Sequence, residues 1–314
     1  MSRSPATSEA RGAFTPDLGL AHNRDASSGP CLGGRPAQAC PRPVVFLPMF
    51  GALFGGKKAR RARLRATPIA EDHRAILQGN VPWYGRLAPE DRRELEGHVQ
   101  VFLDEKQFEA TADFEINDEV RVTIAGHACL LIMHRPTDVF PTVRSVLVRP
   151  TEYVAERSRP LWNVLGGMAV VDEEERLGEA GQDGVVVLAW DEVIALADAE
   201  DDAVNVVAHE FAHELDREDG AMNGAPVLAT RTQRAEWARV CEAEFRKLRT
   251  GIASRGALDE YGAKDPAEFF AVATEAFLER PVRLRRRHPE LYDQLRAFYR
   301  LDTAAILEVQ SGRA

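Results

Sequence analysis

The sequence predicts an α+β fold in which mainly helical parts flank a short run of strands. Toward both ends of the globular region, apolar residues recur with the 3.6-residue period of amphipathic helices. Between these parts lie short β-branched runs bounded by turn residues, which are typical of strands. Helices and strands are therefore grouped along the chain, and the strict strand-helix alternation of a doubly wound sheet is not followed.

Local signals place the individual elements. Two helices lead, one that begins at Pro89 and continues to about Glu109, and one that begins after the capping residue Asn117. Strands are expected over residues 145–148 and 185–190. The 185–190 strand suits an edge position, where an extended peptide could pair with it, and a fully paired central position equally well. The later helices are expected over 201–216, 233–249, 266–279 and 289–299.

Residues 1–66 are expected to form a disordered basic leader, followed by one domain over residues 67–314. Residues 1–43 are rich in Ser, Pro, Gly and Ala without periodicity, so they bury too little apolar surface to offset their ordering entropy. Met49 opens a segment that resembles an ordinary protein start, and it is therefore an alternative start of the chain. An apolar patch and a basic cluster within residues 49–65 suit either a solvated leader or a weak membrane-surface contact.

Charge and cysteine content exclude several classes of protein. The chain has 40 Lys and Arg against 49 Asp and Glu, a net charge of −9. Residues 1–66 carry 11 basic and 3 acidic residues, so the rest of the chain carries −17, which disfavours nucleic-acid binding. The longest apolar run, residues 44–54, is too short for a transmembrane helix. Four cysteines without paired spacing indicate a reducing, cytoplasmic environment.

The motif that carries chemistry is His-Glu-Phe-Ala-His at residues 209–213. Four-residue spacing on a helix places His209 and His213 on one face, one turn apart, as two ligands for one metal. Glu210 lies about 100° around the helix, within reach of a water molecule as a general base. The surrounding residues are apolar, and burying an unpartnered imidazole costs about 1–3 kcal/mol. A metal therefore accounts for the pair better than two core histidines.

Zinc needs a third protein ligand and an open position for water. The metzincin pattern would place a histidine ten residues after His209, where the sequence has Asp219, so that class is excluded. The helix over 266–279 offers Glu268 and Glu275, seven residues apart on one face, and spacing alone does not choose between them. The six other histidines lack ligand spacing and are assigned to structure or solvent.

The stretch 209–216, together with the segment Tyr-Gly-Ala-Lys-Asp-Pro-Ala-Glu-Phe-Phe-Ala at 261–271, resembles the Mlc titration factor A family of zinc metallopeptidases. This family is gluzincin-like, and a more remote similarity is to the catalytic domain of anthrax lethal factor. The likeness extends from about Met49 to the last helix. It implies a zincin-like metallopeptidase fold with a small mixed sheet beside the active-site helix.

The resemblance also implies roles for individual residues. It selects Glu268 as the third zinc ligand, and it matches Tyr261 to a tyrosine that stabilises the transition state. Glu275 is left as a buried polar residue or a support for a ligand, and Asp216 as an orienter of an imidazole.

Two functions from different classes follow from these residues and the resemblance. The first is a zinc-dependent metallopeptidase that cleaves peptide bonds with a zinc-activated water and Glu210 as general base; the resemblance implies aminopeptidase activity on short peptides. The alternative is a regulatory protein that sequesters a transcriptional repressor of sugar uptake, with or without catalysis.

Overall fold

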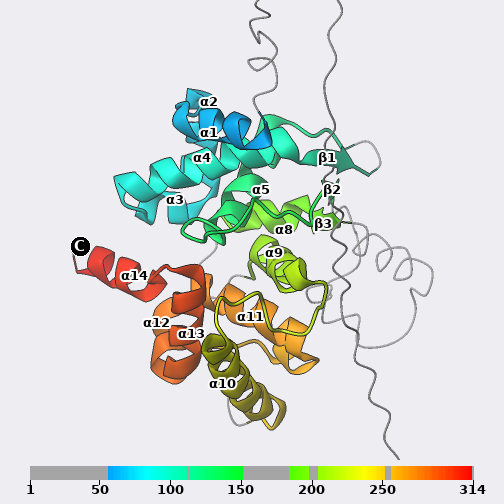
Figure 1. Ribbon diagram of the computed structural model, residues 1–314. Coiled ribbons are helices and arrows are strands. Elements are labelled where there is room, and N and C mark those ends of the chain that lie inside the picture. Colours follow the sequence, from blue (N-terminus) through cyan, green and yellow to red (C-terminus); the bar gives the residue numbers. More distant parts are fainter. Residues whose placement is uncertain (1–55, 112–113, 151–183, 198–203, 252–255, 313–314) are drawn as a thin grey trace, which may run out of the picture. The chain divides into compact units, whose positions relative to one another are not determined.

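The computed structural model describes residues 56–111, 114–150, 184–197, 204–251 and 256–312 (Figure 1). All of them lie in the unit Gly51–Ala314. The disorder expected for residues 1–43, the apolar patch at 49–54 and the alternative start at Met49 fall outside the described residues.

The α+β class is confirmed, because helices flank a three-stranded sheet along the chain. The first half contains α1 (Lys57–Ala66), α2 (Glu71–Asn80), α3 (Pro82–Arg86), α4 (Pro89–Glu105), β1 (Gln107–Ala110), α5 (Asp118–Leu130) and β2 (Ser145–Arg149). The second half contains β3 (Val185–Ala189), α8 (Trp190–Ala195), α9 (Val206–Asp216), η2 (Arg217–Asp219), α10 (Arg231–Arg249), η3 (Glu260–Ala263), α11 (Pro266–Glu279), α12 (Pro281–Arg287), α13 (Pro289–Tyr299) and α14 (Thr303–Ser311).

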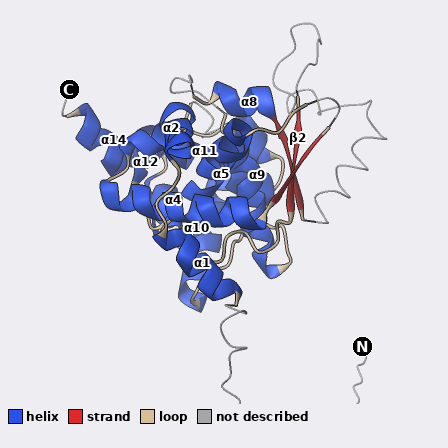
Figure 2. Ribbon diagram, turned by 90° about the horizontal axis from the view of Figure 1, so that it is seen from above, coloured by secondary structure: helices blue, strands red, loops and turns tan. Residues whose placement is uncertain are grey.

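The sheet runs in the order β1-β2-β3, with Gln107 opposite Ser145 and Ser145 opposite Val185. All three described strands are parallel, whereas the resemblance implied a mixed sheet. Figure 2 shows the strands together at one side of the helices. Among the described strands β3 is at an edge, and it leads directly into α8, the helix that precedes α9.

The predicted end of the first long helix is wrong. The helix expected to reach Glu109 ends at Glu105, and the next residues form β1. The buried Lys106 separates the two elements, and its Nζ donates to the backbone oxygens of Phe140 at 2.6 Å and Val143 at 2.8 Å. Burial lowers the pKa of Lys106 to about 8. Because β1 needs a partner strand that is distant in sequence, local periodicity could not reveal it.

The predicted leader also ends too late. Residues 57–66, expected to be disordered, form α1, which packs against α4. The guanidinium of Arg61 binds Glu105 through two hydrogen bonds of 2.5 and 2.7 Å, and it also pairs with Asp138. A bidentate arginine-carboxylate pair is geometrically specific, so it fixes this helix on the domain where composition predicted none.

Helix α9 is held on several sides by apolar contacts. It contacts α5, α8, β3 and α11, and Figure 1 shows it between the sheet and α11. The ring of Phe211, inside the histidine motif, lies 5.7 Å from Phe102 and 4.6 Å from Phe140, between ring centroids. Full burial of such a side chain contributes about 1.5–3 kcal/mol. The motif helix is therefore anchored on its apolar face, which leaves the histidine face for α11.

No described helix combines the length and apolarity needed to cross a bilayer. The two cysteines within the described residues, Cys129 and Cys241, are free thiols.

A buried histidine in α5 makes stability depend on pH. His127 is 1% exposed, its Nε2 lies 3.1 Å from the backbone oxygen of Asn80, and burial lowers its pKa to about 4. The unfolded chain, with a histidine pKa of about 6.5, takes up this proton first as pH falls. The contribution of neutral His127 to the free energy of unfolding is therefore complete above pH 6.5 and is lost toward pH 4, by roughly 3 kcal/mol.

In urea titrations between pH 7 and 4, we expect His127→Gln to remove this part of the decline in unfolding free energy. Parallel curves of unfolding free energy against pH for both proteins would contradict the assignment.

Candidate metal centre

The two motif histidines meet at one point on α9. The helix is capped by Asn205, whose Oδ1 accepts the backbone N–H of Ala208 at 2.9 Å. His209 and His213 stand one turn apart with ring centroids separated by 4.9 Å, and their Nε2 atoms are 3.2 Å apart. The structure thus places both imidazoles as the helical spacing predicted.

Glu268 is the carboxylate that α11 brings to both imidazoles. Its Oε2 lies 3.1 Å from His209 Nε2 and 3.4 Å from His213 Nε2. It stands in the first turn of α11, where the carboxylate of the capping residue Asp265 accepts its backbone N–H at 3.0 Å. This cap fixes the start of the helix and so the position from which Glu268 reaches across to α9.

The spacing of these three atoms fits a metal ion. Tetrahedral zinc with bonds of about 2.0–2.1 Å holds its ligand atoms about 3.3 Å apart. The three distances here lie between 3.1 and 3.4 Å. Two imidazole nitrogens and one carboxylate oxygen are also a common catalytic zinc donor set, with one position left open. The residues therefore fit such an ion.

Glu275 approaches His209 from the opposite side of the ring. Its Oε1 accepts a hydrogen bond from His209 Nδ1 at 2.6 Å, and this orients the ring so that Nε2 faces Glu268 and His213. The other oxygen of Glu275 accepts the backbone N–H of Asn205 at 3.2 Å, and Asn205 Nδ2 donates to Glu279 at 2.7 Å. Asn205 therefore ties the start of α9 to α11.

Sequence reasoning missed Asn205 and Glu279. An asparagine directly before an apolar helix is a capping signal, but the predicted helix began at residue 201. No sequence signal indicated that α11 would pack against this cap.

The electrostatics of the centre favour a cation. Burial alone would lower the pKa of His209, but its hydrogen bonds with Glu268 and Glu275 raise it to about 10. Although burial opposes ionisation of Glu268, the two imidazoles hold its pKa well below the usual range. Burial raises the pKa of Glu275, which is 5% exposed. Positive charge is thus stabilised at the point where the donor atoms converge.

Asp216 does not orient an imidazole, contrary to the prediction. Its two carboxylate oxygens accept the backbone N–H groups of Gly224 at 2.7 Å and Ala225 at 2.9 Å, while Nδ1 of His213 has no hydrogen-bond partner. Asp216 instead holds the loop that follows α9. Both oxygens of its carboxylate accept backbone N–H groups of that loop. The spacing of residues along a helix could not reveal these partners.

That loop connects η2, which follows α9, to α10, and it packs against the start of α11. Gly224 has a φ of +74°, its oxygen accepts the indole N–H of Trp237 at 2.9 Å, and a Cβ there would lie 2.2 Å from the oxygen of Pro266. Pro266 is the first residue of α11, two residues before Glu268. The close contact at Gly224 therefore constrains the position of the first turn of α11, which carries Glu268.

Two further predicted residues border the centre. Glu210 is half-buried next to His209 and makes no hydrogen bond or ion pair with any other residue that the structure describes. The hydroxyl of Tyr261 donates to Glu268 Oε1 at 3.1 Å, and Lys264 Nζ lies 3.2 Å from both of these oxygens. Burial and the charge of Glu268 raise the pKa of Tyr261, so its hydroxyl keeps its proton at neutral pH.

A family model described as glucose-regulated metallopeptidase M90 matches residues 56–300. The chain belongs to this family. A relative named uncharacterized protein slr2042, from Synechocystis sp., is 35% identical over 246 residues, which cover 77% of this chain and 88% of that protein. Mlc titration factor A of Salmonella agona is 28% identical, covering 74% and 87%. The Klebsiella pneumoniae protein of the same name is 29% identical, covering 71% and 83%.

The resemblance to the Mlc titration factor A family is therefore confirmed. The M90 match begins at residue 56 and so includes α1, which agrees with the packing of this helix on α4. Membership in a metallopeptidase family also agrees with the convergence of donor atoms on α9 and α11.

Metal analysis distinguishes the roles of Glu268 and Glu275 on α11. We expect Glu268→Ala to lose bound zinc, because a donor atom is removed. Glu275→Ala should keep the metal with roughly 10- to 100-fold weaker affinity, because only the support of His209 is lost. The measurements are metal content after purification and a competition titration with a chelator. Loss of zinc in Glu275→Ala with retention in Glu268→Ala would reverse the assignment.

Two left-handed glycines provide a matched test of the loop. Gly220 has a φ of +91° with open space around its Cα, so Gly220→Ala should cost only about 1–2 kcal/mol of unfolding free energy. Gly224→Ala meets the same backbone cost plus the clash with Pro266, and we expect at least about 1 kcal/mol more, with weaker metal binding. Chemical denaturation measures both; equal losses would show that the contact does not constrain α11.

Proposed function

We propose that the chain is a zinc-dependent metallopeptidase that hydrolyses peptide bonds, with short peptides as substrates and an aminopeptidase mode of cleavage. The observation that carries the proposal is the convergence of His209, His213 and Glu268 donor atoms, with Glu210 next to His209 on the same helix. Membership in the M90 family supports it. The low cysteine content keeps the cytoplasm as the expected compartment.

The metal and the residues around it have separate roles in the proposed reaction. A bound zinc ion supplies Lewis acidity, which lowers the pKa of a water molecule toward about 7 and polarises the scissile carbonyl. Glu210 accepts the proton of the attacking water and passes it to the departing amine. Because Glu210 has no ion-pair partner among the described residues, its carboxylate is free to take up and release this proton.

Tyr261 donates a hydrogen bond to the developing oxyanion in this proposal. To do so, its hydroxyl must turn away from Glu268 Oε1. Lys264 Nζ lies 3.2 Å from that oxygen and can hold the carboxylate in place while the tyrosine moves. A well-placed donor of this kind contributes roughly 2.7–4 kcal/mol to transition-state stabilisation.

Glu210→Gln is the direct test of the general base. We expect this variant to bind zinc and fold like the wild type but to lose peptide hydrolysis, since an amide cannot accept the proton. Glu260→Gln is the control, because Glu260 is exposed next to Tyr261 and outside the proposed machinery. Hydrolysis retained by Glu210→Gln, or wild-type protein that binds no stoichiometric zinc, would contradict the proposal.

Tyr261→Phe tests the oxyanion donor. We expect kcat to fall by about 10²- to 10³-fold with little change in metal content, because Lys264 still holds Glu268. The measurement is a kcat and KM comparison on a short peptide. A loss of metal equal to the loss of activity would mean that Tyr261 acts only through its bond to Glu268.

A second function is suggested by the name Mlc titration factor A, carried by relatives at 28–29% identity. In this alternative, the chain sequesters a transcriptional repressor, with sugar uptake regulated as a result. Glu210→Gln separates the two functions: repressor binding that survives unchanged in this inactive variant does not require catalysis. No measurable binding to an Mlc-type repressor by the wild type would remove the alternative.

A further inference from the structure

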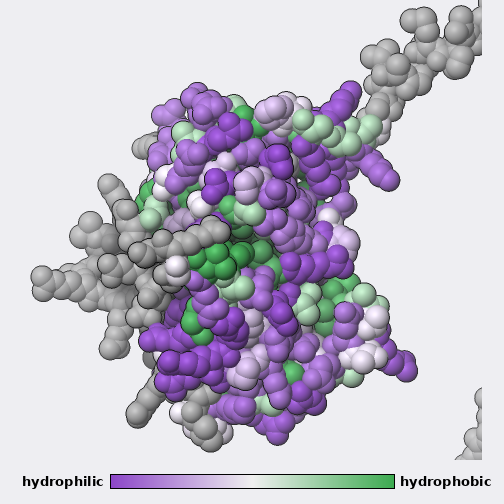
Figure 3. All heavy atoms as spheres, turned by 90° about the vertical axis from the view of Figure 1, so that its left-hand side faces the viewer, coloured by the Kyte–Doolittle hydropathy of each residue, from purple (hydrophilic) through white to green (hydrophobic). Residues whose placement is uncertain are grey.

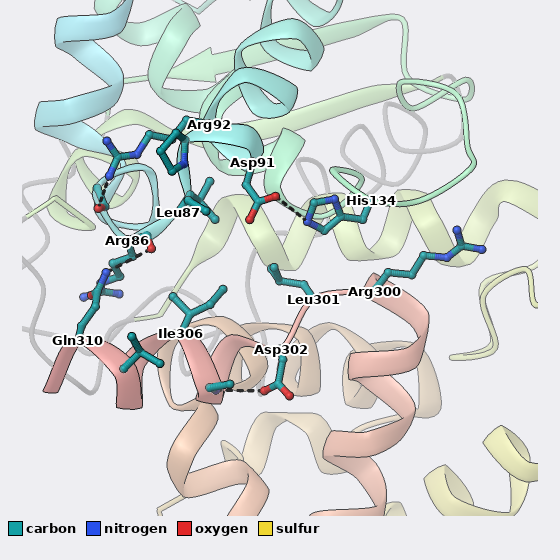
Figure 4. Close-up of a pocket in the computed structure, with 15 residues that line it drawn as sticks. Arg86, Leu87, Asp91, Arg92, His134, Arg300, Leu301, Asp302, Ile306 and Gln310 are labelled. Atoms are coloured by element: carbon teal, nitrogen blue, oxygen red, sulfur yellow. Dashed lines mark hydrogen bonds and ion pairs between the residues drawn. The ribbon is translucent and has the colours of Figure 1, made fainter. Parts of the chain in front are cut away.

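A cavity of about 800 Å³ lies between the start of α4 and helix α14, lined by none of the residues of the candidate metal centre. Figure 3, which looks at the side that carries α3 and α14, shows hydrophobic side chains at the middle of a mostly hydrophilic face. The lining includes the apolar residues Leu87, Leu301 and Ile306. Two polar residues, Asp91 and His134, face each other at its edge (Figure 4).

A third residue completes a cluster at this edge. Asp91 and Glu94 stand one turn apart on α4, and His134 lies in the turn after α5. His134 Nδ1 is 3.0 Å from Glu94 Oε2, and His134 Nε2 is 3.5 Å from Asp91 Oδ1. One ligand atom from each of the three residues lies within 4.8 Å of the others. Side-chain exposures of 29%, 43% and 24%, in chain order, leave the cluster open to ions from solvent.

The two carboxylates of the cluster have no basic ion-pair partner other than histidine among the described residues. Within the described part of the chain, neither Asp91 nor Glu94 pairs with a lysine or arginine. Arg92 donates to the backbone oxygen of Gly85 at 2.8 Å, and in Figure 4 Arg92 and Arg300 point away from the Asp91–His134 pair. A second histidine, His98, lies 3.7 Å from Glu94. His98 is buried, with 5% of its surface exposed.

The placement of His134 between two carboxylates has a chemical consequence. A neutral imidazole carries one N–H and one lone pair, so it can donate to only one of the two acidic groups. The other nitrogen can then donate its lone pair to a metal cation that a carboxylate oxygen also binds. Oxygen and imidazole donors together suit divalent first-row metals, zinc among them.

We propose that Asp91, Glu94 and His134 form a second divalent-cation site, separate from the centre on α9 and α11. The ion links the first turns of α4 to the segment after α5 at the edge of the cavity, with its remaining positions open to water. Because its side chains are partly exposed, this site is weaker than the buried centre, which also has three protein donors. The three residues lie in two separate parts of the chain, so their spacing in the sequence does not indicate a site, and the sequence alone assigns His134 to structure or solvent.

The test is a calorimetric titration of metal-free, full-length protein with Zn²⁺. We expect two equivalents for the wild type and one for His134→Ala or Asp91→Asn. The matched control is His73→Ala, because His73 is 25% exposed and lies 3.4 Å from a single carboxylate, that of Asp118. It should keep both equivalents. A second equivalent that also raises the Tm in wild type and His73→Ala, but not in His134→Ala, supports the site.

Glu268→Ala separates this proposal from the proposed function. It should lose the tighter equivalent and keep the weaker one, so failure at either site is seen independently. The second site is refuted if the wild type binds a single equivalent that Glu268→Ala removes. It is equally refuted if His134→Ala and Asp91→Asn, shown to be folded by circular dichroism, retain two, or if His73→Ala loses as much binding as His134→Ala.

Discussion

The candidate metal centre depends on one constraint, which is that the first turn of α11 lies against the side of α9. Glu268, in the first turn of α11, must come within hydrogen-bond distance of both imidazoles on α9. Bringing a carboxylate and two imidazoles into a largely apolar interior costs free energy unless each finds a partner of opposite character. The surrounding contacts supply those partners and hold the two helices in register.

The two helices are joined near both of their ends. Asn205 caps α9 and binds Glu275 and Glu279 of α11, while Asp216 at the other end of α9 holds the loop that abuts Pro266. The groups that hold the centre are buried or nearly so. Glu210 and Tyr261, the groups assigned to chemistry, are half-buried at its border. The proposed ligands are therefore held by several contacts, whereas the groups proposed to react lie partly exposed at the border of the centre.

Features that depend on residues close together in the sequence could be predicted, whereas features that depend on contacts between distant segments could not. The histidine pair depends only on helical periodicity, so its geometry could be expected without knowledge of the fold. The choice between Glu268 and Glu275 is a matter of distance between helices, and it needed the family resemblance; the structure shows that both contact His209, at opposite nitrogens. The role of Asp216 was misjudged because its partners lie in a loop with no periodic signal.

Two errors in the fold prediction have the same origin. β1 depends on pairing with β2, and α1 depends on packing against α4. Local periodicity alone therefore predicts neither element. By contrast, α11 and α13 begin and end where the pattern placed them, since each starts with a proline and presents a continuous apolar face.

The contact between α1 and α4 has a practical consequence for anyone shortening this protein. Arg61 is shared by Glu105 and Asp138, two acidic groups that belong to different parts of the chain. Composition alone would place the start of the domain after residue 66. A protein shortened there would lose Arg61, the common counter-ion of both acidic groups, and would expose the side of α4 that α1 covers. A trimmed version meant for crystallisation should therefore retain the whole of α1.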